Sequence, residues 1–276
     1  MKRGSVAEKV IAITGGARGI GLATATVLHD LGAAVAIGDI DRSAVKEAGT
    51  GLSLKVARRL DVTDPRSFKD FLDNAEDQLG PVDVLVNNAG VIAVGSAVDE
   101  ADAITRRVLD VNIYGVILGT KLAAQRMLAR GHGHIVNIAS LGSVLPAEGI
   151  ATYCATKHAV LGYTDSVRLE NRGSGVQFSA ILPTLVNTEM IAGAGRGRGV
   201  RTAEPEEVAR AVAGVIAKPN PRVFVPRSVG VLAGVQRVLP RRLTEATGRA
   251  IGTDRVFTSD VDVDKRSAYA RRTGTS

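Results

Sequence analysis

The stretch V-I-A-I-T-G-G-A-R-G-I-G, from Val10 to Gly21, predicts the start of an α/β fold. It opens with a short, mostly β-branched run that predicts a fully buried strand, and an amphipathic helix to about Leu31 follows. Glycines 15, 19 and 21 allow a tight turn and let backbone N–H groups approach a phosphate at the helix N-terminus. The spacing G-x-x-x-G-x-G differs from the G-x-G-x-x-G of the general dinucleotide fingerprint. A glycine-rich turn without a ligand is therefore the alternative.

An acidic residue follows the next predicted strand, residues 34–38. Asp39 lies 18 residues after Gly21, close to the separation expected for the acid that binds the adenosine ribose. Its charge would repel a 2′-phosphate by about 1–4 kcal/mol, or about ten- to thousand-fold in affinity. Asp39 therefore favours NAD over NADP, whereas Arg18 and Arg42 argue weakly for NADP.

Strands and helices continue to alternate along the chain. Residues 56–60 and 82–86 predict two further strands, and Pro65 starts a helix to about Leu79, with proline at an early position as expected. Such alternation predicts a parallel sheet with helices on both faces. Ligands of such sheets lie at the carboxyl ends of the strands. Polar residues follow the predicted strands at Thr14, Asp39, Asp61, Asn88 and Ser140.

The composition fits one large α/β domain. The chain has 276 residues, of which 45% are hydrophobic, with no tryptophan and only 3% aromatic residues. A core of Val, Ile, Leu and Ala suits buried parallel strands covered by helices. The single cysteine, Cys154, excludes an intramolecular disulfide and fits a reducing compartment. A small buried side chain is favoured there over a reactive thiol.

Charge and hydropathy narrow the partners and the location. The net charge is +7, of which +5 falls in residues 226–276, so the basicity belongs to the tail. The N-terminus lacks the apolar core of a secretion signal, and no apolar run approaches about 18 residues, so we expect a cytoplasmic protein without a transmembrane helix. The main domain shows no basic face with interleaved aromatic residues, so we expect no nucleic-acid binding. His132 and His134 alone do not make a metal site.

A second stretch, S-L-G-S-V-L-P-A-E-G-I-A-T-Y-C-A-T-K from Ser140 to Lys157, contains three side chains that can act together. Tyr153 and Lys157 are four residues apart and share one face of a predicted helix. An ammonium one turn away favours the phenolate, whose ordinary pKa is about 10. Lowering that pKa to about 7 takes roughly 4 kcal/mol, so a second positive charge, such as an oxidised nicotinamide ring, is expected nearby. The alternative is an ordinary amphipathic helix with a buried Tyr and a solvent-reaching Lys.

Together these motifs resemble the short-chain dehydrogenase/reductase (SDR) family over roughly residues 7–226. The match includes T-G-G-A-R-G-I-G at 14–21, D-V at 61–62, N-N-A-G at 87–90, Asn112 in V-N-I, Ser140, and Y-C-A-T-K at 153–157. The resemblance implies a single domain with a Rossmann-type, doubly wound parallel sheet of about seven strands. It also implies reversible hydride transfer between NAD(P)(H) and an alcohol or carbonyl.

The resemblance implies a role for each matched residue. Tyr153 would be the general acid/base, Ser140 would hold the substrate oxygen, and Lys157 would lower the pKa of Tyr153 and bind the nicotinamide ribose. Asn112 would support a helix kink and a water in a proton relay, or in the alternative would only satisfy backbone groups within its helix. The implied cofactor contacts, with Asp61 and Val62 at the adenine, are Gly15, Arg18, Gly19, Ile20, Gly21, Asp39, Asp61, Val62, Asn88, Ala89, Gly90, Tyr153, Lys157, Pro183, Val186 and Thr188.

One segment departs from the family pattern. After a predicted strand at residues 177–182 the family has Pro-Gly, whereas this chain has P-T-L-V-N-T from Pro183 to Thr188. Thr184 disfavours the positive φ that glycine allows, so the local backbone is expected to differ. Val186 and Thr188 keep their register, so binding of the nicotinamide carboxamide is expected to survive.

Domain boundaries can also be predicted. Residues 1–226 form the expected catalytic domain, which includes a glycine- and arginine-rich segment at 188–203 as a mobile substrate lid or, in the alternative, a loop without a role. Residues 227–276 form a basic C-terminal extension, with a helix around 231–239 and a polar, flexible tail from 258. The helix could cover the substrate pocket, pack on another subunit or lie on a membrane surface, with docking on its own chain favoured.

The sequence thus predicts an NAD(H)-dependent oxidoreductase that interconverts a secondary alcohol and a carbonyl. A homo-oligomer, dimer or tetramer, is expected from the resemblance. The apolar lid and extension favour a lipophilic substrate, such as a steroid, retinoid or lipid-derived alcohol. The alternatives are a non-catalytic NAD-binding sensor or scaffold, an NADP-dependent ketoreductase, and an epimerase or dehydratase on a related fold.

Overall fold

The computed structural model describes the chain except residues 1–5, 196–200, 231–233, 235–241, 243–254 and 276. At the centre of the described residues lies a parallel sheet of seven strands in the order β3-β2-β1-β4-β5-β6-β7. The strands are β1 (Val10–Thr14), β2 (Ala34–Asp39), β3 (Val56–Arg59), β4 (Val84–Asn87), β5 (Gly133–Ile138), β6 (Val176–Pro183) and β7 (Arg222–Val225). The predicted doubly wound α/β fold is confirmed.

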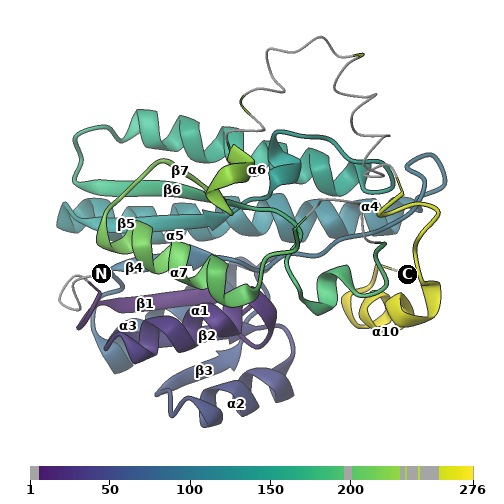
Figure 1. Cartoon of the computed structure of the whole chain (residues 1–276). Coiled ribbons are helices and arrows are strands. Elements are labelled where there is room, and N and C mark those ends of the chain that lie inside the picture. Colours follow the sequence, from purple (N-terminus) through teal and green to yellow (C-terminus); the bar gives the residue numbers. More distant parts are fainter. Residues whose placement is uncertain (1–5, 196–200, 231–233, 235–241, 243–254, 276) are drawn as a thin grey trace.

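Helices cover both faces of this sheet (Figure 1). One face shares a hydrophobic core with α1 (Gly19–Asp30), α2 (Arg42–Gly51) and α7 (Pro205–Ala217). The other face is covered by α3 (Pro65–Leu79), α4 (Asp102–Leu109), α5 (Gly115–Arg130) and α6 (Ala151–Glu170). Both cores consist mainly of Val, Ile, Leu and Ala, as the composition predicts.

Helix α3 shows how the local sequence sets the ends of an element. Asp64 precedes the helix and accepts a hydrogen bond from the backbone N of Arg66 at 2.9 Å. Pro65 lies in the first turn, where its missing N–H leaves no helical bond unmade. The buried face consists of Phe68, Phe71, Leu72 and Ala75, which recur at helical spacing. The predicted helix, from Pro65 to about Leu79, is therefore the observed one.

Strands β1 and β4 mark the point at which the winding of the sheet changes direction. Their register pairs Ile13 with Val86, so the two strands end side by side. Thr14 Oγ1 accepts hydrogen bonds from the backbone N of Asn88 and of Ala89, both at 3.0 Å. The turn after β1 is therefore tied to the turn after β4 at the switch point, where ligands of such sheets bind.

A buried row of polar side chains holds the middle of the sheet against helices α5 and α6. Asn87 Nδ2 donates to Asn137 Oδ1 at 2.9 Å and to Thr120 Oγ1 at 3.3 Å. Asn137 Nδ2 in turn donates to Thr164 Oγ1 at 2.8 Å. These buried groups bond to one another, so burying the row costs little free energy. The row also fixes the position of α6 on the sheet.

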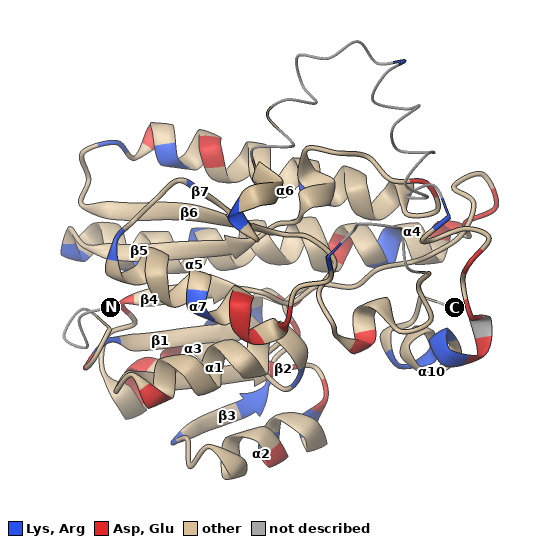
Figure 2. Ribbon diagram, in the orientation of Figure 1, with Lys and Arg blue, Asp and Glu red and all other residues tan. Residues whose placement is uncertain are grey.

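The end of the chain differs from its prediction. Where the sequence predicts a flexible tail, the structure has the helix α10 (Val263–Thr273). Asp262 caps its N-terminus and Gly274 caps its C-terminus. The Asp262 side chain accepts a hydrogen bond from the backbone N of Lys265 at 3.1 Å. Lys and Arg are prominent on α10 (Figure 2), which made the segment look like a solvated tail. Arg266, Tyr269 and Ala270 of this helix are nevertheless buried.

Some predictions fall outside the described residues. Most of the helix expected around 231–239 does, and so do residues 196–200 of the expected lid. Within the described ranges of the chain, no helix combines the length and the apolar character needed to cross a membrane.

Candidate active site

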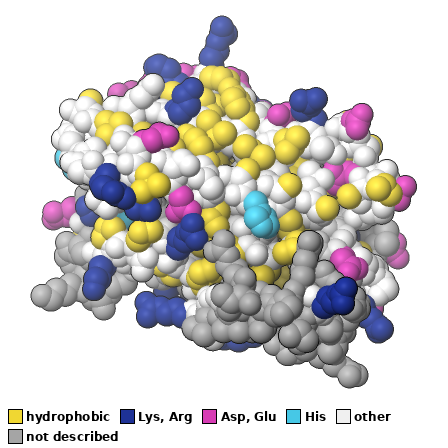
Figure 3. Space-filling view, turned by 90° about the horizontal axis from the view of Figure 1, so that it is seen from above, with side chains coloured by type: hydrophobic (Ala, Val, Ile, Leu, Met, Phe, Trp, Pro, Cys, Tyr) yellow, Lys and Arg dark blue, Asp and Glu magenta, His cyan; other side chains and the backbone are white. Residues whose placement is uncertain are grey.

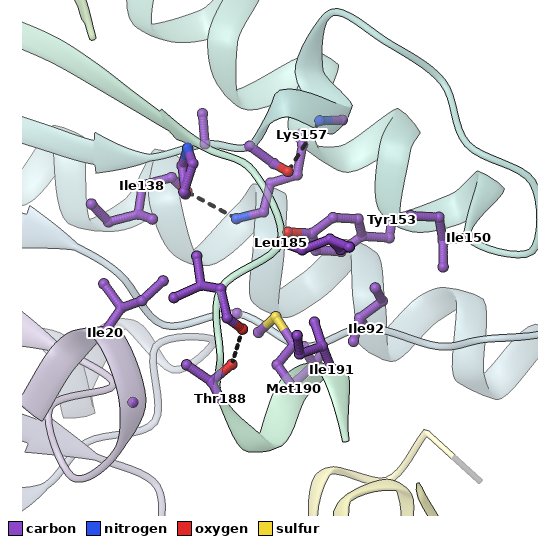
Figure 4. A pocket seen from close by; sticks show the side chains of 18 of the residues that line it. Ile20, Ile92, Ile138, Ile150, Tyr153, Lys157, Leu185, Thr188, Met190 and Ile191 are labelled. Carbon is purple, nitrogen blue, oxygen red and sulfur yellow. Dashed lines mark hydrogen bonds between the residues drawn. The ribbon is translucent and has the colours of Figure 1, made fainter. Parts of the chain in front are cut away.

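A cavity of about 1340 Å³ lies at the carboxyl ends of the strands. It is lined by sixteen of the residues that the sequence singles out: Gly15, Arg18, Gly19, Ile20, Asp39, Asp61, Val62, Asn88, Ala89, Gly90, Ser140, Tyr153, Lys157, Pro183, Val186 and Thr188. Figure 4 shows Tyr153 and Lys157 extending from α6 into this cavity, with Ile20 of α1 on the opposite side. Gly21 and Asn112 do not line the cavity. They pack against or bond to residues that do, Gly15 and Val91.

The glycine-rich turn between β1 and α1 forms one end of the cavity. Gly15 and Gly19 have φ of +64° and +52°, the left-handed region that glycine enters without strain. A Cβ on Gly21 would lie 1.9 Å from the carbonyl O of Gly15, so only glycine fits there. Asn88 Nδ2 donates to the backbone O of Thr14 and of Gly15, both at 3.0 Å. The turn is therefore held open at the N-terminus of α1, where backbone N–H groups favour a phosphate.

Asp39 lies at the end of β2 beside this turn. Its Oδ2 accepts a hydrogen bond from the backbone N of Ala17 at 3.2 Å, and its Oδ1 accepts one from the backbone N of Asp41 at 3.1 Å. Arg18, which could have met a 2′-phosphate, is bound instead to Asp41, with Nη2 and Oδ2 2.7 Å apart. Hydrogen bonds from Ser43 and Arg18 lower the pKa of Asp41. Asp41 was not among the predicted site residues, although its position as the residue before α2 is typical of a helix cap.

Asp61 and Val62 lie after β3 at the same end of the cavity. Asp61 Oδ1 accepts hydrogen bonds from the backbone N of Thr63 at 3.0 Å and from its Oγ1 at 2.7 Å. Burial alone would raise the pKa of Asp61, but the bonds from Thr63 and the charge of Arg107 outweigh it, and the pKa falls. A charged carboxylate is therefore kept near the predicted adenine position.

Lys157 is buried and Tyr153 is partly buried, and the loss of contact with water shifts their pKa values in opposite directions. Lys157 Nζ donates to the backbone O of Ile138 at 2.9 Å and lies 5.6 Å from the centre of the Tyr153 ring (Figure 4). Burial lowers the pKa of Lys157 to about 8. Burial also raises the pKa of Tyr153, while a hydrogen bond with Ser140 opposes that rise. In the protein alone burial thus keeps Tyr153 a neutral phenol, although the Lys157 ammonium lies close to its ring.

Asn112 lies in a π-helical turn, Asp110–Tyr114, between α4 and α5. Its Oδ1 accepts from the backbone N of Val91 at 2.8 Å. Its Nδ2 donates to the backbone O of Val91 at 2.8 Å and to Thr156 Oγ1 at 3.1 Å. The irregular turn agrees with the expected kink, and the amide joins the segment after β4 to helix α6, which carries Tyr153.

The backbone after β6 accommodates threonine where the family has glycine. Among the described non-glycine residues, only Glu8 and Ser53 have positive φ, so Thr184 carries no such strain. Its backbone N donates to the O of Val225 at 2.9 Å. Farther along, Thr188 closes on the glycine-rich turn, since a Cβ on Gly19 would lie 3.1 Å from Thr188 Cγ2. Val186 and Thr188 both face the cavity, as their register predicts.

The other end of the cavity is apolar. Its lining comes from four separate segments and includes Ile92, Ile150, Leu185, Met190, Val256 and Phe257. All six pack in one hydrophobic cluster with Tyr153. The sequence did not single out these residues, because their common location depends on segments far apart in the chain. The Tyr153 hydroxyl therefore meets any substrate in surroundings poor in water.

A cavity with a phosphate-binding turn at one end and a Tyr–Lys pair near the other is typical of dinucleotide-dependent oxidoreductases with a Rossmann-type sheet. Residues 9–199 match the family described as short chain dehydrogenase. The chain belongs to the short-chain dehydrogenase/reductase family.

Individual relatives agree with this assignment. The chain is 31% identical over 265 residues to "Probable oxidoreductase EphD" of Mycobacterium tuberculosis H37Rv, covering 87% of this chain and 45% of that protein. It thus spans about half the length of that relative. It is 38% identical over 223 residues to cis-4-hydroxycyclohexanecarboxylate dehydrogenase of Sinomonas cyclohexanicum, covering 75% of this chain and 88% of that protein. An SDR of Burkholderia phymatum in complex with NAD has the same fold, with a TM-score of 0.75 at 24% identity over 82% of this chain and 92% of that one.

Proposed function

We propose that the protein interconverts a lipophilic secondary alcohol and its ketone, using NAD(H). The observation that carries this proposal is the position of Tyr153, with Ser140 and Lys157 beside it, at the junction of two parts of one cavity. One part has a phosphate-binding turn and the carboxylate of Asp39, and the other part is apolar.

The residues present fit a nicotinamide dinucleotide. The glycine-rich turn would hold the pyrophosphate, Asp39 the adenosine ribose, and Asp61 with Val62 the adenine. Lys157 would reach the nicotinamide ribose, and Val186 with Thr188 the carboxamide. When bound, the oxidised cofactor supplies the hydride acceptor and a positive charge near Tyr153.

The chain's own residues would handle the proton and the substrate oxygen. The Ser140 hydroxyl would donate a hydrogen bond to that oxygen and hold it near Tyr153. In the oxidative direction the Tyr153 phenolate accepts the hydroxyl proton, and in the reductive direction the neutral phenol donates it. The apolar side chains around Tyr153 exclude water, which strengthens the hydrogen bonds to a developing alkoxide.

A lipophilic ring alcohol fits the apolar end best. Its lining presents hydrophobic side chains from four segments, although Glu148 and the paired Glu189 and Arg272 also line the cavity. A relative at 38% identity is named for a cyclohexane-ring alcohol substrate. Both observations support an alicyclic secondary alcohol as the substrate class.

A panel of secondary alcohols tests the proposed function. The purified protein is mixed with NAD and cyclohexanols, steroid alcohols, short aliphatic alcohols or sugars, and NADH formation is followed by its absorbance. Net NADH formation with ring or steroid alcohols is expected. Reaction with only sugars or small polar alcohols would refute the lipophilic substrate. Cofactor binding without any turnover would favour the NAD-binding sensor, which does not need a proton-transfer group.

Replacing Asp39 by Ala is expected to narrow the preference for NADH over NADPH by about ten- to thousand-fold, because a carboxylate near a 2′-phosphate costs about 1–4 kcal/mol. The two dissociation constants can be measured by the fluorescence of the reduced cofactors. Asp77→Ala is the matched control, since this exposed carboxylate of α3 does not line the cavity. Equal binding of both cofactors by the unmutated protein would contradict the proposed NAD preference.

The reaction is expected to depend on pH in opposite senses in its two directions. Burial raises the pKa of Tyr153, so the phenolate that accepts the substrate proton becomes populated only as the pH rises. Alcohol oxidation should therefore accelerate with pH, and ketone reduction, which needs the neutral phenol, should slow. Initial rates at saturating cofactor in both directions check this. An oxidation rate that does not change with pH would contradict a titrating Tyr153.

We also propose that the protein forms a homo-oligomer through the faces of α5 and α6. Viewed from above, hydrophobic side chains gather over a broad part of the surface (Figure 3). Leu128 of α5, Leu169 of α6 and Tyr114 are among the exposed large hydrophobic residues. Exposed apolar area of this kind is typical of a subunit contact. Sedimentation or light scattering of the purified chain can test it.

A further inference from the structure

The described residues 255–275, here called the C-terminal arm, pack against the two segments that border the substrate end of the cavity. One is the loop that leads to Tyr153: a Cβ on Gly149 would lie 2.0 Å from the carbonyl O of Phe257. The other is the segment after Thr188: a Cβ on Gly193 would lie 2.3 Å from the carbonyl O of Asp262. The lack of a side chain at these two glycines therefore lets the arm pack closely, and a larger residue at either position would clash with it.

Main-chain hydrogen bonds hold the arm on the expected lid. The backbone N of Gly195 donates to the O of Val256, and the backbone N of Asp262 donates to the O of Gly193, both at 2.8 Å. An ion pair adds to them, with Arg272 Nη2 2.5 Å from Glu189 Oε2. The arm is thus bound to the described part of the expected lid, and both border the cavity.

Tyr269 of α10 reaches through this layer to the segment after β4. Its side chain is buried, and its hydroxyl O accepts a hydrogen bond from the backbone N of Ile92 at 3.2 Å. Arg266 Nη2 donates to the backbone O of the same Ile92 at 3.2 Å, and Arg266 Nη1 donates to the O of Met190 at 3.1 Å. Both backbone polar groups of Ile92 are therefore bound by α10.

The Tyr269 ring faces the cavity near the reacting group. It lines the cavity and packs in the hydrophobic cluster that contains Tyr153 and Phe257. The Arg266 and Arg272 guanidinium carbons lie over the ring, 5.3 Å and 5.6 Å from its centre. The hydroxyl is bound to the backbone N of Ile92 and the ring contacts two arginines, so the side chain has little freedom to move aside for a substrate.

We propose that Tyr269 is a specificity-determining residue: its ring closes the substrate end of the cavity and limits the bulk that a ring alcohol can carry on the side facing α10. This inference rests on the proposed function, because it concerns the substrate of the same site. Ring alcohols or ketones with a large substituent directed at α10 are therefore excluded.

The test compares Tyr269→Ala with Tyr269→Phe. The kcat/KM values for 4-phenylcyclohexanol and cyclohexanol are measured, and their ratio is expected to rise about tenfold or more in Tyr269→Ala, which removes the ring. Tyr269→Phe keeps the ring and is expected to keep the ratio, with any loss confined to the bond from Ile92. Arg271→Ala is the matched control, since this exposed arginine of α10 does not line the cavity. An unchanged ratio in Tyr269→Ala would overturn the proposal.

Ligand binding separates this proposal from the proposed function. If no alcohol in the panel reacts, the proposed function has failed, and calorimetric binding of 4-phenylcyclohexanone and cyclohexanone to the NAD-saturated protein decides about Tyr269. Tyr269→Ala is then expected to favour the bulky ketone by about tenfold more than the unmutated protein does. The role of Tyr269 would be overturned if both proteins had the same ratio of affinities for the two ketones. It would also be overturned if neither ketone bound to either protein. Unchanged circular dichroism and NADH affinity in Tyr269→Ala establish that the variant folds.

Discussion

Replacing Tyr153 by Phe is expected to reduce turnover by about a hundred- to ten-thousand-fold, the usual contribution of a positioned acid or base. The substitution removes one hydroxyl and keeps the ring that packs in the apolar cluster with Ile150 and Leu185. The phosphate-binding turn and Asp39 lie at the other end of the cavity and keep their geometry. NADH affinity, measured by the fluorescence of the bound cofactor, should therefore change little.

The matched control for this prediction is Tyr163→Phe. Tyr163 lies on the same helix, α6, is only partly buried and does not line the cavity. Its loss of a hydroxyl should leave both turnover and NADH affinity near their original values. Substantial turnover by Tyr153→Phe would show that another group transfers the proton. A large loss of NADH affinity would show instead that the variant disturbs the whole cavity.

Much of the fold was predictable because its signals are local. The capping residue Asp64 and Pro65 set the start of α3, and the apolar run before Thr14 marks a buried strand. The cofactor end of the cavity was predictable for a related reason. Parallel strands place their carboxyl ends at one edge, so polar residues such as Asp39 and Asn88, which follow their strands in the sequence, come together.

The C-terminal arm was not predictable in this way. The hydrogen bond between Tyr269 and Ile92 joins residues 177 positions apart, and no local pattern records it. The polar composition of residues 258–276 indicated a solvated tail, because the side chains that anchor α10 to the site include the charged Arg266 and Arg272 and the polar Tyr269. The glycines at 193 and 195 indicated mobility for a similar reason. The sequence alone does not distinguish a glycine that allows close packing from a glycine that makes a segment mobile.

The influence of burial on the reacting groups was also hidden. The spacing of Tyr153 and Lys157 predicted that the ammonium would favour the phenolate. Depth of burial is a property of the folded domain, and it raises the pKa of Tyr153 and lowers that of Lys157. In the protein alone, charge on either group is therefore unfavourable, and a bound oxidised nicotinamide would supply a positive charge that favours the Tyr153 phenolate.

Replacing Lys157 by Met is expected to make the cofactor-free protein more stable while it removes most of the activity. Lys157 is 4% exposed, and its ammonium has one hydrogen bond, to the backbone O of Ile138. Its pKa falls from 10.5 to about 8 on folding. Below pH 8 the folded state therefore carries the full cost of a buried charge, about 3 kcal/mol from the conversion of 1.36 kcal/mol per pKa unit. Losing the bond to Ile138 offsets about 1 kcal/mol of the gain.

The sign of the pH dependence makes this prediction specific. Because the folded pKa of Lys157 is depressed, the unfolded chain binds more protons between pH 8 and 10.5, and the unmutated protein gains stability as the pH rises through that window. The advantage of Lys157→Met should thus be largest near neutral pH and shrink toward pH 10.5. Urea unfolding of both proteins across this range measures it, with Lys121→Met, an exposed lysine of α5, as the control. A variant that is less stable than the unmutated protein at neutral pH would mean that Lys157 supports the fold, whereas a more stable and inactive variant would show that this buried charge is kept for the reaction at a cost in stability.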